Sequence, residues 1–198
     1  MNLPRVETEH VRSRGEHEIL DACRAGDREA FRELFEIHSG RVRSVALHFF
    51  GGDGGAADDV VQAVFVKLHA RIPQFRGDSQ LSTWLHRLVV NTCLDDRRAG
   101  RRLLPLETVD GSDPGRVNPA QAEAAERGQR ERRVRAAVAS LPPKLRIAVL
   151  LRHFEELSYD EMAAALGCSS GTVASRLNRG HAALSRTLAE FAPKESPR

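Results

Sequence analysis

A face of small and hydrogen-bonding side chains recurs at helical spacing near the C-terminal end of the chain. Its positions are Gly171, Ala174, Ser175, Asn178 and Arg179, and they point away from the apolar Val173 and Leu177. In the major groove of DNA, asparagine can make paired hydrogen bonds to adenine, and arginine can make them to guanine. Three neighbours, Ser170, Thr172 and Arg176, are better placed for phosphate groups. This pattern indicates a helix that reads base edges, with phosphate contacts beside it.

The segment Leu157–Arg176 (LSYDEMAAALGCSSGTVASR) must position this face, and it is typical of a helix-turn-helix. Ser158 and Glu161 have the spacing of a capping box, which predicts where the first helix begins. Gly167 suits the end of that helix, and Ser169 can cap the second. The alternative is a helical hairpin that packs and binds nothing. The agreement of caps, turn glycine and inward apolar residues favours DNA binding.

A second polar stripe lies on a helix that we expect from Leu81 to about Arg98. The apolar side of this helix consists of Leu81, Leu85, Leu88 and Thr92. The polar stripe consists of Thr83, Arg87, Asn91 and Arg98. Cations and hydrogen-bonding groups on one stripe suit a nucleic-acid backbone or base edges. The helix dipole, which favours cations at a helix C-terminus, is enough to explain Arg97, Arg98, Arg101 and Arg102, but it does not explain the stripe before them.

Residues 58–71 are expected to form another helix, with Asp58 and Asp59 at its N-terminus, where the dipole favours them. Its apolar stripe consists of Val61, Val64, Phe65, Leu68 and Ile72. The opposite face carries Asp59, Gln62, Ala63, Val66 and Ala70. Such a mixed face suits the docking of a partner helix. A solvated surface with one exposed valine explains the same residues equally well.

The composition and the positions of proline and glycine predict an all-α protein of two small helical domains joined by a flexible linker. Aromatic residues make up only 5% of the 198 residues, and helix-forming types dominate. The expected parts are a disordered extension (1–17), a first domain (18–103), a linker rich in proline and glycine (104–128), a second domain (129–192) and a tail (193–198). The net charge is only +3, but cations outnumber carboxylates in 73–103 and 129–198, whereas 104–128 is acidic. Two basic blocks suit a chain that grips DNA at two places.

In the first domain, helical spacing from Glu18 to Phe50 predicts core residues that include Phe31, Leu34 and Phe35, with a bend near Gly40. The glycine-rich residues 51–55 are expected to be a flexible connector. They lack the G-K-[ST] ending of a phosphate-binding loop, and no strand precedes them.

Several function classes are excluded. Cys23, Cys93 and Cys168 are far apart without a C-x-x-C pair, which indicates buried thiols in a reducing compartment. No apolar run approaches transmembrane length, and the first residues lack the apolar segment of a signal peptide. Adjacent acids such as Asp95 and Asp96 do not face each other on a helix, and no metal-ligand spacing occurs. We therefore expect a cytoplasmic protein that is not an enzyme, with no cofactor, metal or small-molecule substrate.

Three blocks in this order resemble a bacterial sigma factor of the extracytoplasmic-function group. They are DDVVQAVFVKLHA (58–70), QFRGDSQLSTWLHRLVVNTCLDDRR (74–98) and LPPKLRIAVLLRHFEELSYDEMAAALGCSSGTVASRLNRG (141–180). Each block alone is weak, but the three together are specific. The resemblance implies a sigma-70 family protein that holds regions 2 and 4 only, binds core RNA polymerase and directs it to particular promoters.

The resemblance also implies a role for each surface. Asp58–Ala70 would dock on the clamp helices of the largest polymerase subunit, and the flap would be a further polymerase contact. The loop Phe75–Ser79 would receive a flipped base of the minus-10 element, with Arg76, Gly77, Asp78 and Ser79 supplying donors and acceptors. The helix from Ser82 to Arg98 would contact the surrounding strand, and the helix-turn-helix would read the minus-35 element. An anti-sigma factor is an expected partner.

One other function remains open: a one-component helix-turn-helix regulator with an N-terminal sensor or dimer domain. The basic stripe in the first domain argues against it. The sequence departs from the family at Ala174, where many relatives carry a basic residue, and at Gly180-His181, where many carry Ala-Arg. Both changes reduce phosphate contacts, and Gly180 should weaken its helix.

Overall fold

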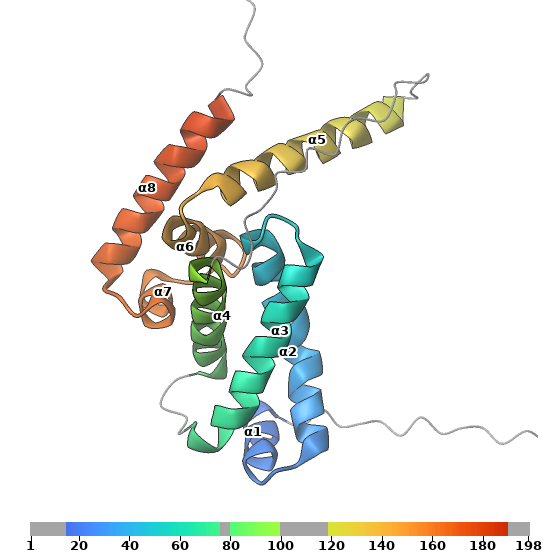
Figure 1. Cartoon of the computed structure of the whole chain (residues 1–198), viewed down its shortest axis with the longest axis vertical. Helices are drawn as coiled ribbons and strands as arrows, with labels where there is room; N and C mark the ends of the chain where they lie inside the picture. Colours follow the sequence, from blue (N-terminus) through green and yellow to red (C-terminus); the bar gives the residue numbers. More distant parts are fainter. Residues whose placement is uncertain (1–14, 76–79, 100–118, 190–198) are drawn as a thin grey trace, which may run out of the picture.

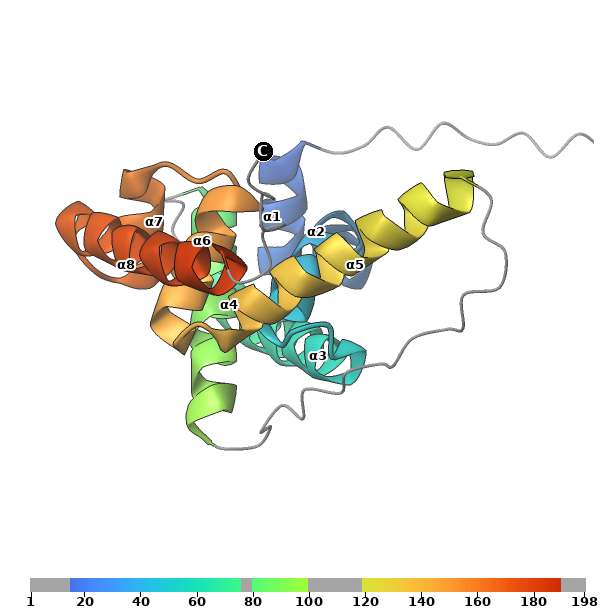
Figure 2. The ribbon, with the colours of Figure 1, turned by 90° about the horizontal axis from the view of Figure 1, so that it is seen from above.

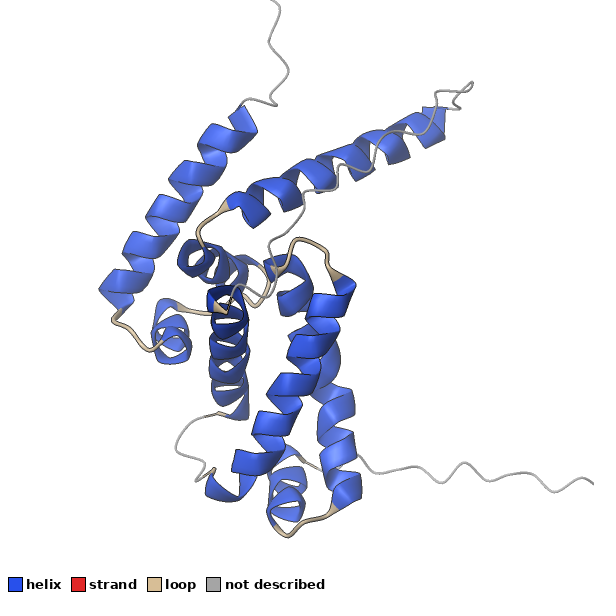
Figure 3. Cartoon of the chain, in the orientation of Figure 1, coloured by secondary structure: helices blue, strands red, loops and turns tan. Residues whose placement is uncertain are grey.

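The computed structural model describes residues 15–75, 80–99 and 119–189, with side chains from 125 onward in the last range. In these ranges every regular element is helical (Figure 3), as expected for an all-α protein. In chain order the elements are α1 (Glu16–Arg24), α2 (Arg28–Phe49), α3 (Gly54–Arg71), the 3-10 turn η1 (Ile72–Gln74), α4 (Leu81–Arg98), α5 (Pro119–Ser140), α6 (Pro143–His153), α7 (Tyr159–Leu166) and α8 (Ser170–Ala189).

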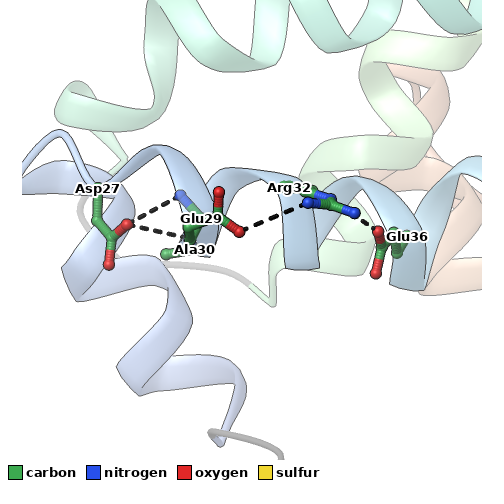
Figure 4. Close-up of polar contacts among 5 residues, drawn as sticks. All are labelled: Asp27, Glu29, Ala30, Arg32 and Glu36. Carbon is green, nitrogen blue, oxygen red and sulfur yellow. Dashed lines mark hydrogen bonds and ion pairs between the residues drawn. The ribbon is translucent and has the colours of Figure 1, made fainter.

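Helix α2 begins at a side-chain cap that sequence analysis overlooked. The Asp27 carboxylate accepts hydrogen bonds from the backbone N–H groups of Glu29 (2.9 Å) and Ala30 (3.3 Å), as Figure 4 shows. Arg32 then pairs with Glu29 and Glu36 along the exposed side of the helix. The chain is therefore interrupted at residues 25–27, where Gly26 has a positive φ of 86°, and α2 continues through Gly40.

Helix α3 begins four residues earlier than expected. Asp53 is its N-cap, and the Asp53 carboxylate accepts a hydrogen bond from the backbone N–H of Ala56 (2.9 Å). The last two glycines of the 51–55 segment are therefore helical, and Asp58 and Asp59 lie one turn inside the helix. The sequence interpretation missed this start because two more acids follow Asp53 at another suitable position.

Helix α5 begins within the segment that we expected to be a linker. It starts at Pro119, ten residues before the expected return of helical structure at Gln129. Proline fits the first turn of a helix, and the alanines and glutamates that follow are strong helix formers, so composition outweighs the lack of apolar periodicity. The expected linker residues 104–118 lie outside the described part of the chain.

Helix α4 stands at the centre of the molecule. In Figures 1 and 2 it lies between α3 on one side and the pair α6 and α7 on the other, and it contacts all three. Helices α1 to α4 bury one set of apolar residues, including Leu34, Val64 and Leu85, and α6 to α8 bury another, including Ile147 and Leu177. The two sets join into one continuous core. The polar faces of both halves are thus positioned by a shared apolar interior.

Candidate nucleic-acid and docking surfaces

The helix-turn-helix forms as the sequence predicted. Ser158 and Glu161 make the capping box: the Glu161 carboxylate accepts from the Ser158 backbone N–H (2.8 Å) and hydroxyl (2.6 Å), and the Ser158 hydroxyl accepts from the Glu161 N–H. These hydrogen bonds from Ser158 lower the pKa of the Glu161 carboxyl. Gly167 ends α7 in the left-handed conformation (φ 60°), and the Ser169 hydroxyl accepts from the Thr172 N–H at the start of α8.

The expected reading face of α8 is open to solvent over most of its length. Gly171, Ser175, Asn178 and Arg179 are exposed, whereas Ala174 is half-buried. Arg179 uses Nε to donate to the Ser175 carbonyl one turn earlier (3.3 Å), which directs the guanidinium along the helix surface. The flanking residues Ser170, Thr172 and Arg176 are half-buried. Ser170 donates its hydroxyl to the Asp160 carboxylate (2.8 Å), so this hydroxyl joins the two helices of the motif as well as lying near the expected DNA.

Gly180 has a packing role that the sequence did not reveal. It is buried, and a Cβ built on it would lie 2.8 Å from Cγ2 of Val149 in α6. Helices α6 and α8 therefore approach each other at a point where no side chain fits. Glycine still lowers the helix propensity of α8, but its lack of a side chain permits the close contact between α6 and α8.

The polar stripe of α4 is also largely exposed. The side formed by Leu81, Leu85, Leu88 and Thr92 is buried as expected. On the stripe, Arg87, Asn91 and Arg98 are exposed and Thr83 is half-buried. Arg98 pairs with Asp95 (3.0 Å). Arg87 donates from Nε to the carbonyl oxygen of Ala164 in α7 (3.2 Å), so the first helix of the helix-turn-helix reaches this stripe.

Phe75, the first residue of the expected base-binding loop, is buried. Its ring is buried and stacks on Trp84, with centroids 4.9 Å apart, and Arg24 donates to its carbonyl oxygen (2.6 Å). Phe75 therefore anchors the beginning of the loop and does not present its ring to solvent. The other four residues of that loop, Arg76, Gly77, Asp78 and Ser79, lie outside the described residues.

The outer face of α3 is exposed along its whole expected length. Asp58, Asp59, Gln62, Val66 and Ala70 are exposed and Ala63 is half-buried. Val66 is 64% exposed, so this face presents an aliphatic side chain to solvent.

This face continues onto α2. Phe35, expected in the core, is 40% exposed. A hollow of about 430 Å³ lies between the two helices, and its lining includes Phe35, Gly40, Val61 and Gln62. The sequence interpretation was wrong for Phe35 because helical spacing alone cannot show where an apolar stripe ends. Arg43 and Asp58, which form an ion pair (2.7 Å), also line this hollow.

A buried polar cluster at the junction of the two halves was missed by sequence analysis. The Glu155 carboxylate accepts from His86 Nε2 (2.8 Å) and from Arg41 Nε. Arg146 is only 2% exposed, and it donates to the carbonyl oxygen of Phe49 (2.6 Å). Burial, with a smaller contribution from Arg97, lowers the pKa of Arg146 to about 10. No local spacing signals these pairs, because their members lie far apart in sequence.

The cysteines show no sign of reactivity where the structure describes them. Cys23 and Cys93 are buried and Cys168 is half-buried, and all three are unpaired. Burial raises the pKa of the Cys23 and Cys93 thiols, which disfavours the reactive thiolate. Within the described residues, no group of three or more potential ligands could hold a metal ion. None of the described helices is long and apolar enough to cross a membrane.

Comparison with known proteins links both halves to one family. The family description "Sigma-70 region 2" matches residues 34–103, and "Sigma-70, region 4" matches residues 131–184. The RNA polymerase sigma-H factor of Pseudomonas aeruginosa is 32% identical over 181 residues, which cover 87% of this chain and 93% of that protein. The ECF RNA polymerase sigma-E factor of Escherichia coli is 32% identical over 176 residues, which cover 84% and 90%.

Two solved structures are similar over most of the chain. CnrH, in complex with the cytosolic domain of CnrY, superposes with a TM-score of 0.63 at 26% identity, covering 88% of this chain and 97% of that one. The sigma factor RpoE of Bartonella quintana, in complex with the anti-sigma factor NepR, superposes with a TM-score of 0.60 at 22% identity, covering 80% and 96%. The second likeness concerns the fold alone.

Proposed function

The chain belongs to the extracytoplasmic-function group of the sigma-70 family, and on that premise we propose which of its surfaces carry out each step of promoter recognition. It is a sigma factor that directs transcription initiation, with core RNA polymerase and promoter DNA as partners. The region 2 match occupies the part that a one-component regulator would use for sensing or dimerisation, so that alternative is not favoured. The chain acts as a specificity subunit in the cytoplasm and has no catalytic activity of its own.

Residues 18–103 serve as region 2 and residues 129–192 as region 4. In region 4, α8 enters the major groove of the minus-35 element, and Asn178 and Arg179 read base edges. Gly171, Ala174 and Ser175 allow close approach of the helix, while Ser170, Thr172 and Arg176 face phosphates. What supports this assignment is the exposure of Ser175, Asn178 and Arg179 on one side of α8, whose N-terminus is capped by the Ser169 hydroxyl.

In region 2, the exposed stripe of α4 contacts the minus-10 strand through Thr83, Arg87, Asn91 and Arg98. The loop Phe75–Ser79 receives a flipped base, and the stacking of Phe75 on Trp84 holds the first residue of that loop in place. The observation that carries the whole proposal is that one chain presents two separate polar faces, on α4 and on α8, while α3 offers a third and partly apolar face.

That third face docks on core polymerase. Asp58, Asp59, Gln62, Ala63, Val66 and Ala70 form a strip along α3 that suits a helical partner such as the clamp helices. Exposed Val66 and the neighbouring Phe35 supply apolar contact area, which a purely solvated face would not need. Region 4 makes a further contact with the flap. An anti-sigma factor, of the kind bound to the related RpoE, competes for these surfaces.

Open-complex formation on a cognate promoter, selected by run-off transcription with reconstituted holoenzyme, tests the proposal. Replacing Arg87 and Asn91 with alanine removes the cation and amide of the α4 stripe, so promoter opening should fall about tenfold or more while core binding stays intact. Arg32→Ala is the matched control, because Arg32 is an exposed arginine on α2 away from the stripe. Equal promoter opening by the double variant and the control would refute the assignment of α4.

A further inference from the structure

Two histidines face each other across the contact between α6 and α8. His153 is the last residue of α6, and His181 lies on α8 directly after Gly180. Their Nε2 atoms are 2.9 Å apart, and their ring centroids are 5.2 Å apart with the ring planes tilted by 58°. Both residues are exposed, and neither is among the residues proposed to contact DNA or to form the α3 docking face. The two ring nitrogens are therefore accessible to a small solute.

Close helix packing sets the separation of these two side chains. A Cβ built on Gly180 would lie 2.8 Å from Cγ2 of Val149, so α6 and α8 approach each other closely at this point. His153 lies about one helical turn beyond Val149 on α6. The backbones that carry the two imidazoles are thus held together by a contact in which the imidazoles take no part. The departures from the family pattern at Gly180 and His181 therefore act at one place: the glycine lets the helices approach, and the histidine completes the pair.

The surroundings of His153 favour the neutral imidazole. Burial, with smaller contributions from His181 and Arg152, lowers the pKa of His153. A neutral imidazole carries one ring proton, and its unprotonated nitrogen can bind a metal ion. The neighbouring Arg152 donates to the Leu157 carbonyl oxygen (2.8 Å), and its guanidinium lies 5.9 Å from the centroid of the Tyr159 ring. The cation beside His153 is therefore held by the residues at the start of α7.

The separation of the two Nε2 atoms suits a single metal ion. Metal–imidazole bonds are about 2.0–2.1 Å long, so two imidazoles in neighbouring positions of a square-planar or octahedral ion have their nitrogens about 3 Å apart. The ring that donates from Nε2 must then carry its proton on Nδ1 instead, which leaves its charge unchanged. Imidazole ligands suit Ni²⁺, Cu²⁺ and Zn²⁺, whereas Mg²⁺ prefers oxygen ligands.

We propose that His153 and His181 form a two-histidine site for a divalent transition-metal ion, with water in the remaining coordination positions. The ion joins the end of α6 to the middle of α8, and so ties the recognition helix to the helix behind it. This site goes beyond promoter recognition and does not depend on the roles proposed for the DNA and polymerase faces. The two ligands are 28 residues apart, so no local spacing indicates them in the sequence.

Nickel titration of the untagged full chain by isothermal titration calorimetry tests the site. Replacing either ligand, by His153→Gln or His181→Gln, should weaken Ni²⁺ binding about tenfold or more, because the remaining imidazole loses a second ligand held at high effective concentration. His17→Gln is the matched control, because His17 is exposed on α1, and this variant should bind Ni²⁺ as wild type does.

Two results of the titration would overturn the proposal. If both ligand variants bind Ni²⁺ as tightly as the control variant, the two histidines hold no metal ion, and their contact is only a hydrogen bond between imidazoles. If each ligand variant binds one ion fewer than wild type with unchanged affinity for the rest, the two histidines bind separate ions and form no shared site.

Urea denaturation gives a second and independent measurement. Ni²⁺ should raise the urea midpoint of wild type and of His17→Gln, because the two ligands come together only in the folded chain. The midpoints of His153→Gln and His181→Gln should rise much less, and Mg²⁺ at the same concentration should leave all four midpoints unchanged. An equal Ni²⁺ effect on all four chains would place the bound ion elsewhere and contradict the proposal.

Discussion

The absence of a side chain at Gly180 sets the distance between two helices of region 4. A Cβ at this position would lie 2.8 Å from Cγ2 of Val149, a short and β-branched residue that cannot swing aside. The contact is long-range in sequence, so the local pattern showed only a glycine that weakens a helix. The departure from the family pattern at Gly180 is therefore explained by its close contact with Val149. A test of Gly180 must also vary Val149.

Gly180→Ala should destabilise the chain although alanine is the better helix former. The gain in helix propensity is about 1 kcal/mol, whereas overpacking of a close contact costs about 1–3 kcal/mol. We expect a net loss of about 1 kcal/mol in the free energy of unfolding, measured by urea denaturation. Gly171→Ala is the matched control on the same helix, because its nearest neighbour is the Ser169 hydroxyl at 4.0 Å, and it should stabilise the chain. The converse ranking of the two variants would refute the packing argument, and adding Val149→Ala should recover part of the loss.

Helix boundaries could be predicted where a single nearby residue suits the cap position, and less well where several residues suit it. Ser158, Glu161 and Gly167 fixed the bounds of α7, since cap, partner and turn glycine all lie within ten residues. The start of α3 was placed too late, because Asp53, Asp58 and Asp59 all suit a helix N-terminus and only packing selects Asp53. At the element scale, the sequence therefore predicts that a helix exists more reliably than where it begins.

The capping box of α7 should give the helix-turn-helix a stability that depends on pH. Because hydrogen bonds from Ser158 lower the pKa of Glu161, the stability they contribute is complete above the ordinary glutamate pKa of 4.5 and is lost as pH falls through the lowered folded value. Ser158→Ala should cost about 1 kcal/mol of unfolding free energy near neutral pH and less in acid. Urea denaturation at both conditions measures this, with Ser175→Ala, an exposed serine inside α8, as the control. A cost that is the same in acid as at neutral pH would show that Glu161 takes no part.

The arrangement of the two halves of the molecule depends on contacts that no local sequence pattern predicts. Arg41 and Glu155 are 114 residues apart, and Arg146 and Phe49 are 97 apart, so neither pair has a spacing to recognise. The faces of α3, α4 and α8 were predictable, because helical periodicity separates their buried and exposed sides. How those faces lie relative to one another depends on the shared apolar core and on polar contacts between residues far apart in sequence, so the contact of Arg87 with the Ala164 carbonyl oxygen emerged only from the structure.

Docking of the whole sigma factor on polymerase can be tested at the exposed face of α3. Asp59→Arg with Val66→Glu reverses the charge and removes the apolar contact at two positions seven residues apart, so affinity for core polymerase should fall about tenfold or more. Glu131→Arg with Val134→Glu makes the same two changes on exposed positions of α5, outside the α3 face, and should lower affinity less than the α3 variant does. Competition for labelled core polymerase measures both. If the two double variants compete equally well, the polymerase-binding surface does not lie on α3, and the exposure of Val66 and Phe35 must be explained by a different partner.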